Sequence, residues 1–265
     1  MNPFAIAVFD IDGVVRDVGG SYRRAIADTV EHYTNGQYRP SVEDIDVLKS
    51  EGIWNNDWKA SEVMVHRYFE RQGEPKPDTS YEEIVDYFQR QYRGPDTEDP
   101  DQWTGYIANE PLLMDAAYLR SLFQSGILYA FFSGATRGSA NFVLQRRIGL
   151  ESPILIAMED APSKPDPTGL MMAVELIEKQ MPAAKQLPVI YAGDTAADMK
   201  TIIAAQSQFP DRQWLAVGIL PPHAQKDLEY QEQYAEKLEA AGAVTVLDSV
   251  RSLNAERAKQ ILSTC

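Results

Sequence analysis

The stretch that decides the fold is FAIAVFDIDGVV at residues 4–15, where an apolar run leads directly into two acids and a glycine. A short apolar run that ends in turn residues predicts a buried β-strand. In an extended chain, residues two apart point the same way, so we expect Asp10 and Asp12 to face one reacting centre. Two such carboxylates repel each other unless a cation lies between them, which suits a nucleophile beside a general acid, with a metal holding the pair. An Asp-Gly turn that only closes the strand is the alternative.

Further apolar runs follow, and helix-length segments separate them. Continuous apolar strands joined by helical crossovers predict an α/β fold with a doubly wound parallel sheet that is covered on both faces. Ligands of such sheets bind beyond the carboxyl ends of the strands, so we expect functional residues directly after these runs. The runs are LYAFF (128–132), PILIA (153–157), PVIYA (188–192), WLAVGI (214–219) and AVTVL (243–247).

Residues 18–111 differ from the rest of the chain because they contain amphipathic segments and no strand-like run. We therefore expect a helical domain inserted after the first strand, which leaves residues 1–17 and 112–265 as the core. The amphipathic segments lie near 21–34, 42–51, 57–72 and 80–92.

The composition limits where in the cell the protein is expected and which kinds of partner it is expected to bind. The 265 residues are 44% apolar and carry a formal charge of −14, a field that repels nucleic acid and anionic membranes. The N-terminal sequence turns acidic too early for a secretory signal, and no apolar run reaches the roughly 18 residues of a membrane span. The lone cysteine is Cys265, so no intrachain disulfide is expected. We expect a cytoplasmic protein that binds a small anionic molecule and neither nucleic acid nor membrane; its oligomeric state stays open.

The next two motifs supply an anion site and a cation. FFSGATRG places Ser133 and Gly134 at the end of a strand, just before a helical pattern at 137–147. A hydroxyl, a glycine and exposed N–H groups at a helix start are suited to bind an anion, although Ser133 or Thr136 could instead cap the helix. In APSKPDP the flanking prolines stiffen the loop around Lys164, whose ammonium could neutralise an anionic oxygen.

The fourth motif is YAGDTAADMK at 191–200, which places Asp194 directly after a strand and Asp198 one helical turn later. Their side chains can share a face. Carboxylates are the hard oxygen ligands that Mg²⁺ prefers. The alternative is a pair of acids that are favoured at a helix N-terminus by the helix dipole.

Four motifs in this order, each at the end of a predicted parallel strand, resemble those of the haloacid dehalogenase superfamily. The inserted segment is similar to the helical cap of the phosphoglycolate-phosphatase-like subfamily, which closes over the site and excludes water. The matching residues are Asp10, Asp12, Gly13 and Val14, then Ser133, then Lys164 and Pro165, and finally Gly193, Asp194 and Asp198.

The resemblance implies a Mg²⁺-dependent phosphatase of small-molecule phosphate monoesters. By similarity, Asp10 accepts the phosphoryl group as an aspartyl-phosphate, and Asp12 protonates the leaving oxygen and then activates water. The implied Mg²⁺ ligands are the Asp10 carboxylate, the Asp12 backbone carbonyl and Asp194, with Asp198 as a direct or water-mediated ligand. The implied phosphate-binding residues are Ser133, Gly134 and Lys164.

Substrate choice is expected to lie in the cap, where GIWNNDW at 52–58 is the most distinctive segment. Asn55, Asn56 and Trp58 are candidates to hold a polar organic group. The favoured alternative is that Asn56 or Asp57 caps the next helix while the tryptophans pack.

Two other functions remain open. A phosphomutase of the β-phosphoglucomutase type shares the core and keeps water away from the phospho-enzyme. A catalytically silent small-molecule binding protein would show a damaged motif, and none is damaged. A haloalkanoate dehalogenase is disfavoured because its reaction has no leaving alkoxide for Asp12 to protonate, and a phosphonate hydrolase is disfavoured because the cap has no lysine in a recognisable setting to form an imine.

Overall fold

The computed structural model describes residues 2–51, 53–54 and 56–264. The predictions that concern Asn55 and Cys265 fall outside these residues. The chain divides into two compact units, one of Met1–Asp17 and Pro111–Cys265 and the other of Val18–Glu110. The first boundary coincides with the expected one, and the second lies one residue earlier. Within the described ranges, no helix is long and apolar enough to cross a membrane.

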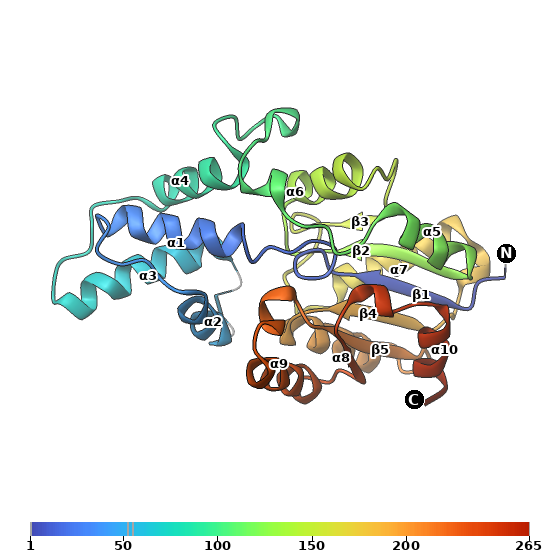
Figure 1. Cartoon of the computed structure of the whole chain (residues 1–265). Helices are drawn as coiled ribbons and strands as arrows, with labels where there is room; N and C mark the ends of the chain where they lie inside the picture. Colours follow the sequence, from blue (N-terminus) through green and yellow to red (C-terminus); the bar gives the residue numbers. More distant parts are fainter. Residues whose placement is uncertain (1, 52, 55, 265) are drawn as a thin grey trace. The chain divides into compact units, whose positions relative to one another are not determined.

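Six parallel strands form the sheet of the first unit, in the order β3-β2-β1-β4-β5-β6 (Figure 1). This confirms the predicted doubly wound α/β fold. Each apolar run of the sequence forms one strand. The two edge strands are shorter than their runs, because an edge strand has a hydrogen-bonding neighbour on one side only. The strands are β1 (Ala5–Phe9), β2 (Ile127–Phe132), β3 (Leu155–Ile156), β4 (Val189–Gly193), β5 (Trp214–Ile219) and β6 (Thr245–Leu247).

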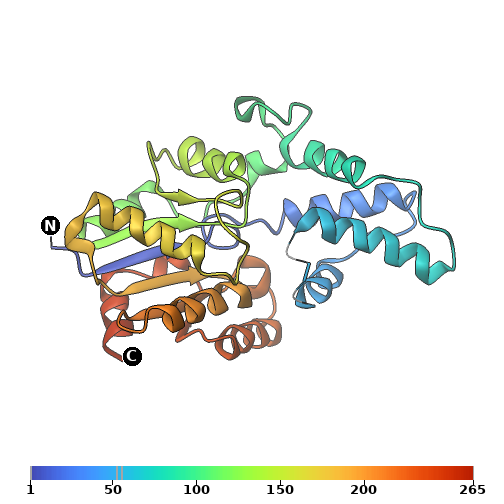
Figure 2. The ribbon, with the colours of Figure 1, turned by 180° about the vertical axis from the view of Figure 1, so that it is seen from behind.

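Helices cover both faces of this sheet, as the apolar strands predict. α5 and α10 lie on the face of the sheet that is turned to the viewer in Figure 1. α7 and α8 lie on the opposite face, which is turned to the viewer in Figure 2. The helical pattern predicted at 137–147 forms α6 and continues as a π-helical turn, η3. The bounds are α5 (Ala116–Gln124), α6 (Arg137–Asn141), η3 (Phe142–Arg147), α7 (Thr168–Gln180), α8 (Ala196–Gln208), α9 (Leu228–Ala240) and α10 (Ala255–Thr264), with short 3-10 turns η4 (Pro182–Ala184), η5 (Pro222–Gln225) and η6 (Val250–Ser252).

Strand β1 lies at the centre of the sheet and is buried along its whole length. Ile6 and Val8 belong to the apolar cluster that includes Ile202 of α8. Phe9 points to the opposite face, where its ring contacts Tyr118 of α5 with the ring centroids 6.5 Å apart. A strand that is covered on both faces must be apolar at every position, which is why its sequence shows no alternation.

The parallel register brings the carboxyl ends of three central strands together. Phe9 of β1 pairs with Phe131 of β2 and with Ala192 of β4. One residue later, the N–H of Asp10 donates to the carbonyl of Ala192 at 2.9 Å. The residues that follow these three strands therefore lie next to one another at one edge of the sheet.

The chain leaves and re-enters the first unit through two paired segments. The N–H of Asp17 donates to the carbonyl of Pro111 at 2.9 Å, and the N–H of Leu113 donates to the carbonyl of Val15 at 2.8 Å. Between these bonds, Arg16 forms an antiparallel bridge with Leu112. The insertion thus begins and ends next to the turn that follows β1.

The second unit is helical, and its helices match the predicted amphipathic segments. Ser41 and Asp44 form a capping box at the start of α2, and Ser80 and Glu83 form another at the start of α4. The bounds are α1 (Tyr22–Tyr33), α2 (Val42–Ser50), α3 (Asp57–Gln72) and α4 (Tyr81–Arg93), with 3-10 turns η1 (Pro100–Gln102) and η2 (Tyr106–Asn109).

Candidate active site

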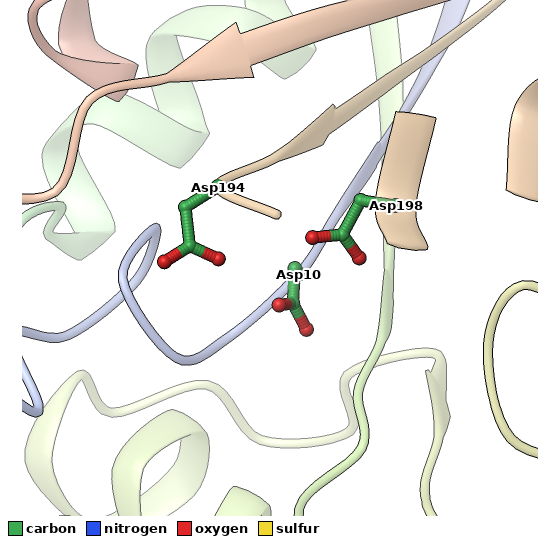
Figure 3. Close-up of side chains that lie close together, drawn as sticks. All are labelled: Asp10, Asp194 and Asp198. Atoms are coloured by element: carbon green, nitrogen blue, oxygen red, sulfur yellow. The ribbon is translucent and has the colours of Figure 1, made fainter. Parts of the chain in front are cut away.

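Acidic side chains gather at the carboxyl ends of the central strands. Asp10 follows β1, Asp194 follows β4, and Asp198 lies in the first turn of α8. Figure 3 shows these three side chains clustered together. One carboxylate oxygen of each lies within 4.8 Å of the other two, and the residues are only 6%, 8% and 0% exposed, respectively. Three buried carboxylates so close together require positive charge nearby.

Lys164 supplies positive charge to this cluster. Its Nζ lies 2.7 Å from Oδ1 of Asp10 and 2.7 Å from Oδ1 of Asp198. Burial by itself lowers the pKa of Lys164, but the two carboxylates outweigh burial and leave that pKa above its ordinary value. The aromatic rings of Phe132 and Tyr191 lie 5.2 Å and 5.5 Å from the ammonium, close enough for cation–π attraction. Lys164 is therefore a fixed cation at the strand ends.

Asp10 is a carboxylate that the fold makes hard to ionise. Burial, opposed by Lys164 and reinforced by the charges of Asp198 and Asp12, raises the pKa of Asp10 to about 7. Among the described residues, Oδ1 of Asp10 has no neighbouring donor other than the Lys164 ammonium. A second cation at this oxygen would favour the ionised form, which is the form that can act as a nucleophile.

Asp198 is engaged by hydrogen bonds on both oxygens. Its Oδ1 accepts from Lys164 at 2.7 Å and from the Tyr191 hydroxyl at 3.0 Å. Its Oδ2 accepts from the N–H of Thr195 at 3.0 Å and from the Thr195 hydroxyl at 2.6 Å, which completes the capping box of α8. Four donors occupy the lone pairs of both oxygens. With both oxygens accepting hydrogen bonds, Asp198 holds Lys164 in place, and its expected role as a direct or water-mediated metal ligand stays a prediction.

Asp194 is positioned by its backbone and by a glycine. Its carbonyl accepts from the hydroxyl of Tyr234, on α9, at 3.1 Å. Gly13 has a φ of +79°, and a Cβ at this position would lie 2.0 Å from Oδ2 of Asp194. On the other side of the cluster, a Cβ at Gly193 would lie 2.3 Å from Cβ of Asp198. Glycine is therefore required at both positions for the carboxylates to approach each other.

These residues fit a divalent cation. The clustered carboxylates of Asp10, Asp194 and Asp198 offer the hard oxygens that Mg²⁺ binds, and a contribution from the backbone carbonyl of Asp12 stays a prediction. A cation at this place would also offset the charge repulsion and the burial that raise the pKa of Asp10.

Ser133 lies in a tight turn before α6. It is 1% exposed, and its Oγ accepts from the N–H of Ala135 at 3.0 Å. Thr136 is the N-cap of α6 and accepts from the N–H of Ser139 at 3.4 Å, which confirms one of the two capping alternatives. A Cβ placed on Gly134 would meet no atom within 4 Å, so the space beside this turn is open to an anion.

Of the three candidate substrate contacts in the helical unit, two are described. Asn56 caps α3, because its side-chain oxygen accepts from the N–H groups of Trp58 and Lys59, each at 3.0 Å. This confirms the favoured alternative for Asn56. Trp58 is half-buried on the first turn of α3. Contact of Asn56 or Trp58 with a substrate stays a prediction.

Three further side chains of the site were not singled out from the sequence. Arg16 is wholly buried beside Asp12, and an arginine that directly follows an apolar run is an unusual place for a charge, which could have marked it. Tyr191 is the one residue with a hydroxyl in PVIYA, a run otherwise typical of a fully buried strand. Tyr234 lies on α9, far along the chain, and its role depends on tertiary packing that leaves no local signal.

A curated protein similar to this chain is named imidazoleglycerol-phosphate dehydratase, from Phytophthora nicotianae. The two are 29% identical over 253 residues, which is 93% of this chain and 50% of that protein. The chain thus spans about half the length of the curated relative that it matches.

Solved structures share the fold. A hydrolase from Deinococcus radiodurans, solved with bound phosphate and sodium, has a TM-score of 0.64 at 17% identity and covers 98% of this chain and 97% of its own. A putative beta-phosphoglucomutase from Thermotoga maritima has a TM-score of 0.56 at 15% identity, with 98% and 99% covered. The sequence pattern of the haloacid dehalogenase-like hydrolases matches residues 4–206, a range that contains all four motifs. The chain therefore belongs to the haloacid dehalogenase-like hydrolases.

Proposed function

We propose that the chain is a Mg²⁺-dependent phosphatase that hydrolyses a small-molecule phosphate monoester through an aspartyl-phosphate on Asp10. An oxygen of Asp10 attacks phosphorus, the bond from phosphorus to the ester oxygen breaks, and Asp12 gives its proton to the departing alkoxide. Asp12 then takes a proton from water as that water attacks phosphorus, and the bond between Asp10 and phosphorus breaks. Inorganic phosphate and an alcohol are the products.

The observation that carries this proposal is the contact of Asp10 with Lys164 at the end of the central strand. The two atoms are 2.7 Å apart, and both side chains are withdrawn from solvent. A nucleophilic carboxylate must approach a phosphoryl group that is itself negative, so a fixed cation has to be at hand. Replacing a buried ion pair with apolar residues is often neutral or stabilising, so a buried pair at this place supports a role in chemistry.

Mg²⁺ is the cofactor that this arrangement fits. Asp10, Asp194 and the carbonyl of Asp12 would hold it, and it would neutralise phosphoryl charge. Ser133 and the backbone at Gly134 would bind the phosphoryl oxygens beside Lys164. Asp198 acts through Lys164: with both of its oxygens occupied, it keeps the ammonium aimed at Asp10. We propose that the helical unit serves as a cap, with Asn55, Asn56 and Trp58 as candidate substrate contacts.

The name of the curated relative, which refers to imidazoleglycerol phosphate, supports testing imidazole-bearing phosphate monoesters first. Imidazole-bearing monoesters such as histidinol phosphate therefore belong in the first set of compounds to test, beside phosphoglycolate, sugar phosphates and nucleotides.

The test is phosphate release from this panel, measured with Mg²⁺ and again with EDTA. The proposal expects release from at least one monoester, loss of that release in EDTA, and a phosphoryl group that can be trapped on Asp10 and located by mass spectrometry. If no monoester releases phosphate while a sugar 1-phosphate is converted to its 6-phosphate, the chain is a phosphomutase. If neither reaction occurs with Mg²⁺ present, the phosphatase proposal fails for this panel, and binding of the same compounds without turnover would favour a small-molecule binding protein on this fold.

A further inference from the structure

A charged side chain lies deeper in the core than any of the four motifs requires. Arg16 is 0% exposed, although arginine is almost never fully buried without a specific partner. It follows Asp12 by four residues, and the two belong to the same turn after β1. The proposed reaction, on which the following inference rests, gives Arg16 no part.

The guanidinium of Arg16 grips one oxygen of Asp12. Its Nε donates to Oδ1 of Asp12 at 2.6 Å, and its Nη2 lies 2.6 Å from the same oxygen. Nη2 also donates to the hydroxyl of Ser139 on α6 at 3.2 Å. Two contacts from a planar, rigid group fix the direction of the carboxylate much better than one contact from a flexible ammonium.

Backbone hydrogen bonds fix the position of Arg16. The N–H of Arg16 donates to the carbonyl of Ile11 at 3.1 Å, and its carbonyl accepts from the N–H of Gly13 at 2.8 Å. A further bridge joins Arg16 to Leu112, where the chain returns to the core. The guanidinium therefore has little freedom to follow Asp12 if that side chain rotates.

The Asp12 carboxylate is more exposed than the guanidinium that contacts it. The Asp12 side chain is 29% exposed while that of Arg16 is 0% exposed, so part of the carboxylate is accessible to solvent. Both contacts described above go to Oδ1. An oxygen that is accessible and held in a fixed direction is what a proton donor to a leaving group needs.

We propose that Arg16 is a positioning residue that clamps Oδ1 of Asp12 and thereby aims Oδ2 at the leaving oxygen of the substrate. The opposing explanation is that Asp12 only neutralises an arginine buried for packing. The two differ in one respect. If Arg16 positions Asp12, its loss should reduce kcat most for substrates whose leaving group needs a proton. If Arg16 serves only packing, its loss should reduce kcat equally for every substrate.

The experiment compares two substrates in Arg16→Met, which keeps the length and apolar character of the stem but removes the donors. One substrate is the best alkyl monoester of the panel, and the other is p-nitrophenyl phosphate, whose leaving group departs without a proton. We expect kcat on the alkyl monoester to fall on the order of 100-fold, the lower range for loss of general acid catalysis. On p-nitrophenyl phosphate we expect a burst of nitrophenolate equal to the enzyme concentration, because Asp10 still attacks while the water step is slowed.

Arg16→Lys and Arg212→Met complete the design. Arg16→Lys retains the buried charge, so it should fold even if Arg16→Met does not, and it should show the same substrate dependence with a smaller loss. Arg212 is another poorly exposed arginine, paired with Glu178 before β5, and it lies at the opposite end of the strands. Its replacement by Met should affect both substrates by the same factor and give no burst.

Equal losses on both substrates in the Arg16 variants, with no burst, would overturn the positioning role. So would unchanged kcat on the alkyl monoester. These outcomes are distinct from failure of the proposed function, which would appear as no phosphate release by the wild-type protein itself.

Discussion

Lys164 Nζ lies 2.7 Å from Oδ1 of Asp10 at the carboxyl end of the central strand, and the two side chains are only 11% and 9% exposed. Neither residue is near the other in the sequence. Removing Lys164 would leave the buried carboxylates of Asp10 and Asp198 without a cation, whereas removing Asp10 would leave Lys164 paired with Asp198. The pair lies at the carboxyl ends of the central strands, which is where open α/β sheets bind their ligands.

Asp10→Asn should abolish turnover, because an amide is a poor nucleophile and cannot form an aspartyl-phosphate. We expect kcat to fall by at least about 10³-fold, as for the loss of other nucleophiles. Phosphate release and the mass of the trapped enzyme both measure this. Asp86→Asn, an exposed acid of α4, is the matched control and should keep full activity. Comparable activity in Asp10→Asn and wild type would rule out covalent catalysis at this residue.

The same substitution should stabilise the metal-free protein at high pH. The pKa of Asp10 is raised from its ordinary value of 3.8 to about 7, so the folded state binds a proton more tightly than the unfolded state. Asp10 therefore lowers stability increasingly as pH rises from about 3.8 through 7. Asn cannot ionise and escapes this penalty. In thermal melts with EDTA, the difference between the melting temperature of Asp10→Asn and that of wild type should grow in favour of the variant as pH rises from about 5 to 8. A difference that does not change with pH would contradict the raised pKa.

Lys164→Met should damage stability and activity together. It leaves Asp10 and Asp198 facing each other without a cation, and breaking a buried pair costs about 3–5 kcal/mol. Chemical denaturation measures the loss, and Mg²⁺ should recover more stability in this variant than in wild type. Lys179→Met, at an exposed position of α7, should leave both properties unchanged. An equal response of both variants to Mg²⁺ would show that Lys164 is not part of a metal-linked charge cluster.

Asp194→Asn and Asp198→Asn should fail in different ways. Asp194 is expected to hold Mg²⁺, so its variant should need at least about 10-fold more Mg²⁺ for half-maximal activity and be partly rescued by excess metal. Asp198 accepts hydrogen bonds from Lys164, Tyr191 and Thr195, so its variant should lose about 1–3 kcal/mol of stability and gain little from excess metal. Titration of activity with Mg²⁺ separates the two. Equal rescue of both variants would make Asp198 a metal ligand after all.

Gly13→Ala should disturb Asp194 by direct contact. The added Cβ would lie 2.0 Å from Oδ2 of Asp194, at a backbone φ of +79°. Gly36→Ala is a close control, because Gly36 has a φ of +76° and open space around it. Both variants bear the cost of an unfavourable φ, about 1–2 kcal/mol. Only Gly13→Ala should also lower kcat and raise the Mg²⁺ concentration needed for half-maximal activity. If the two variants lose the same stability and keep the same activity, crowding of Asp194 is unimportant.

The strands were predictable because each central strand of a doubly wound sheet must be apolar throughout, and this pattern is local. WLAVGI at 214–219 forms β5 with the same ends that the sequence indicates. AVTVL at 243–247 shortens to Thr245–Leu247, because the edge of the sheet offers pairing on one side only. The helix expected at 137–147 changes to a π-helical turn after Asn141, a change of hydrogen-bond period that apolar spacing does not reveal.

The site was predictable in its members but not in their roles. Asp10, Lys164, Asp194 and Asp198 are each placed by a strand end or a stiff loop, so their proximity follows from the topology. The topology does not predict that both oxygens of Asp198 accept hydrogen bonds from Lys164, Tyr191 and Thr195. Such partners depend on side-chain distances between separate elements.

By itself, the sequence determined the layered parallel sheet, the place of the insertion and the edge at which the acids meet, since apolar periodicity and strand-end position are local properties. Only the tertiary structure decided that Arg16 is wholly buried against Asp12, that Gly13 makes room for Asp194, and that one ammonium serves two carboxylates. These contacts form because side chains from segments far apart in the sequence pack together and exclude water. Burial, which sets the strength of every charge in the site, is a property of the packed molecule and not of any stretch of its chain.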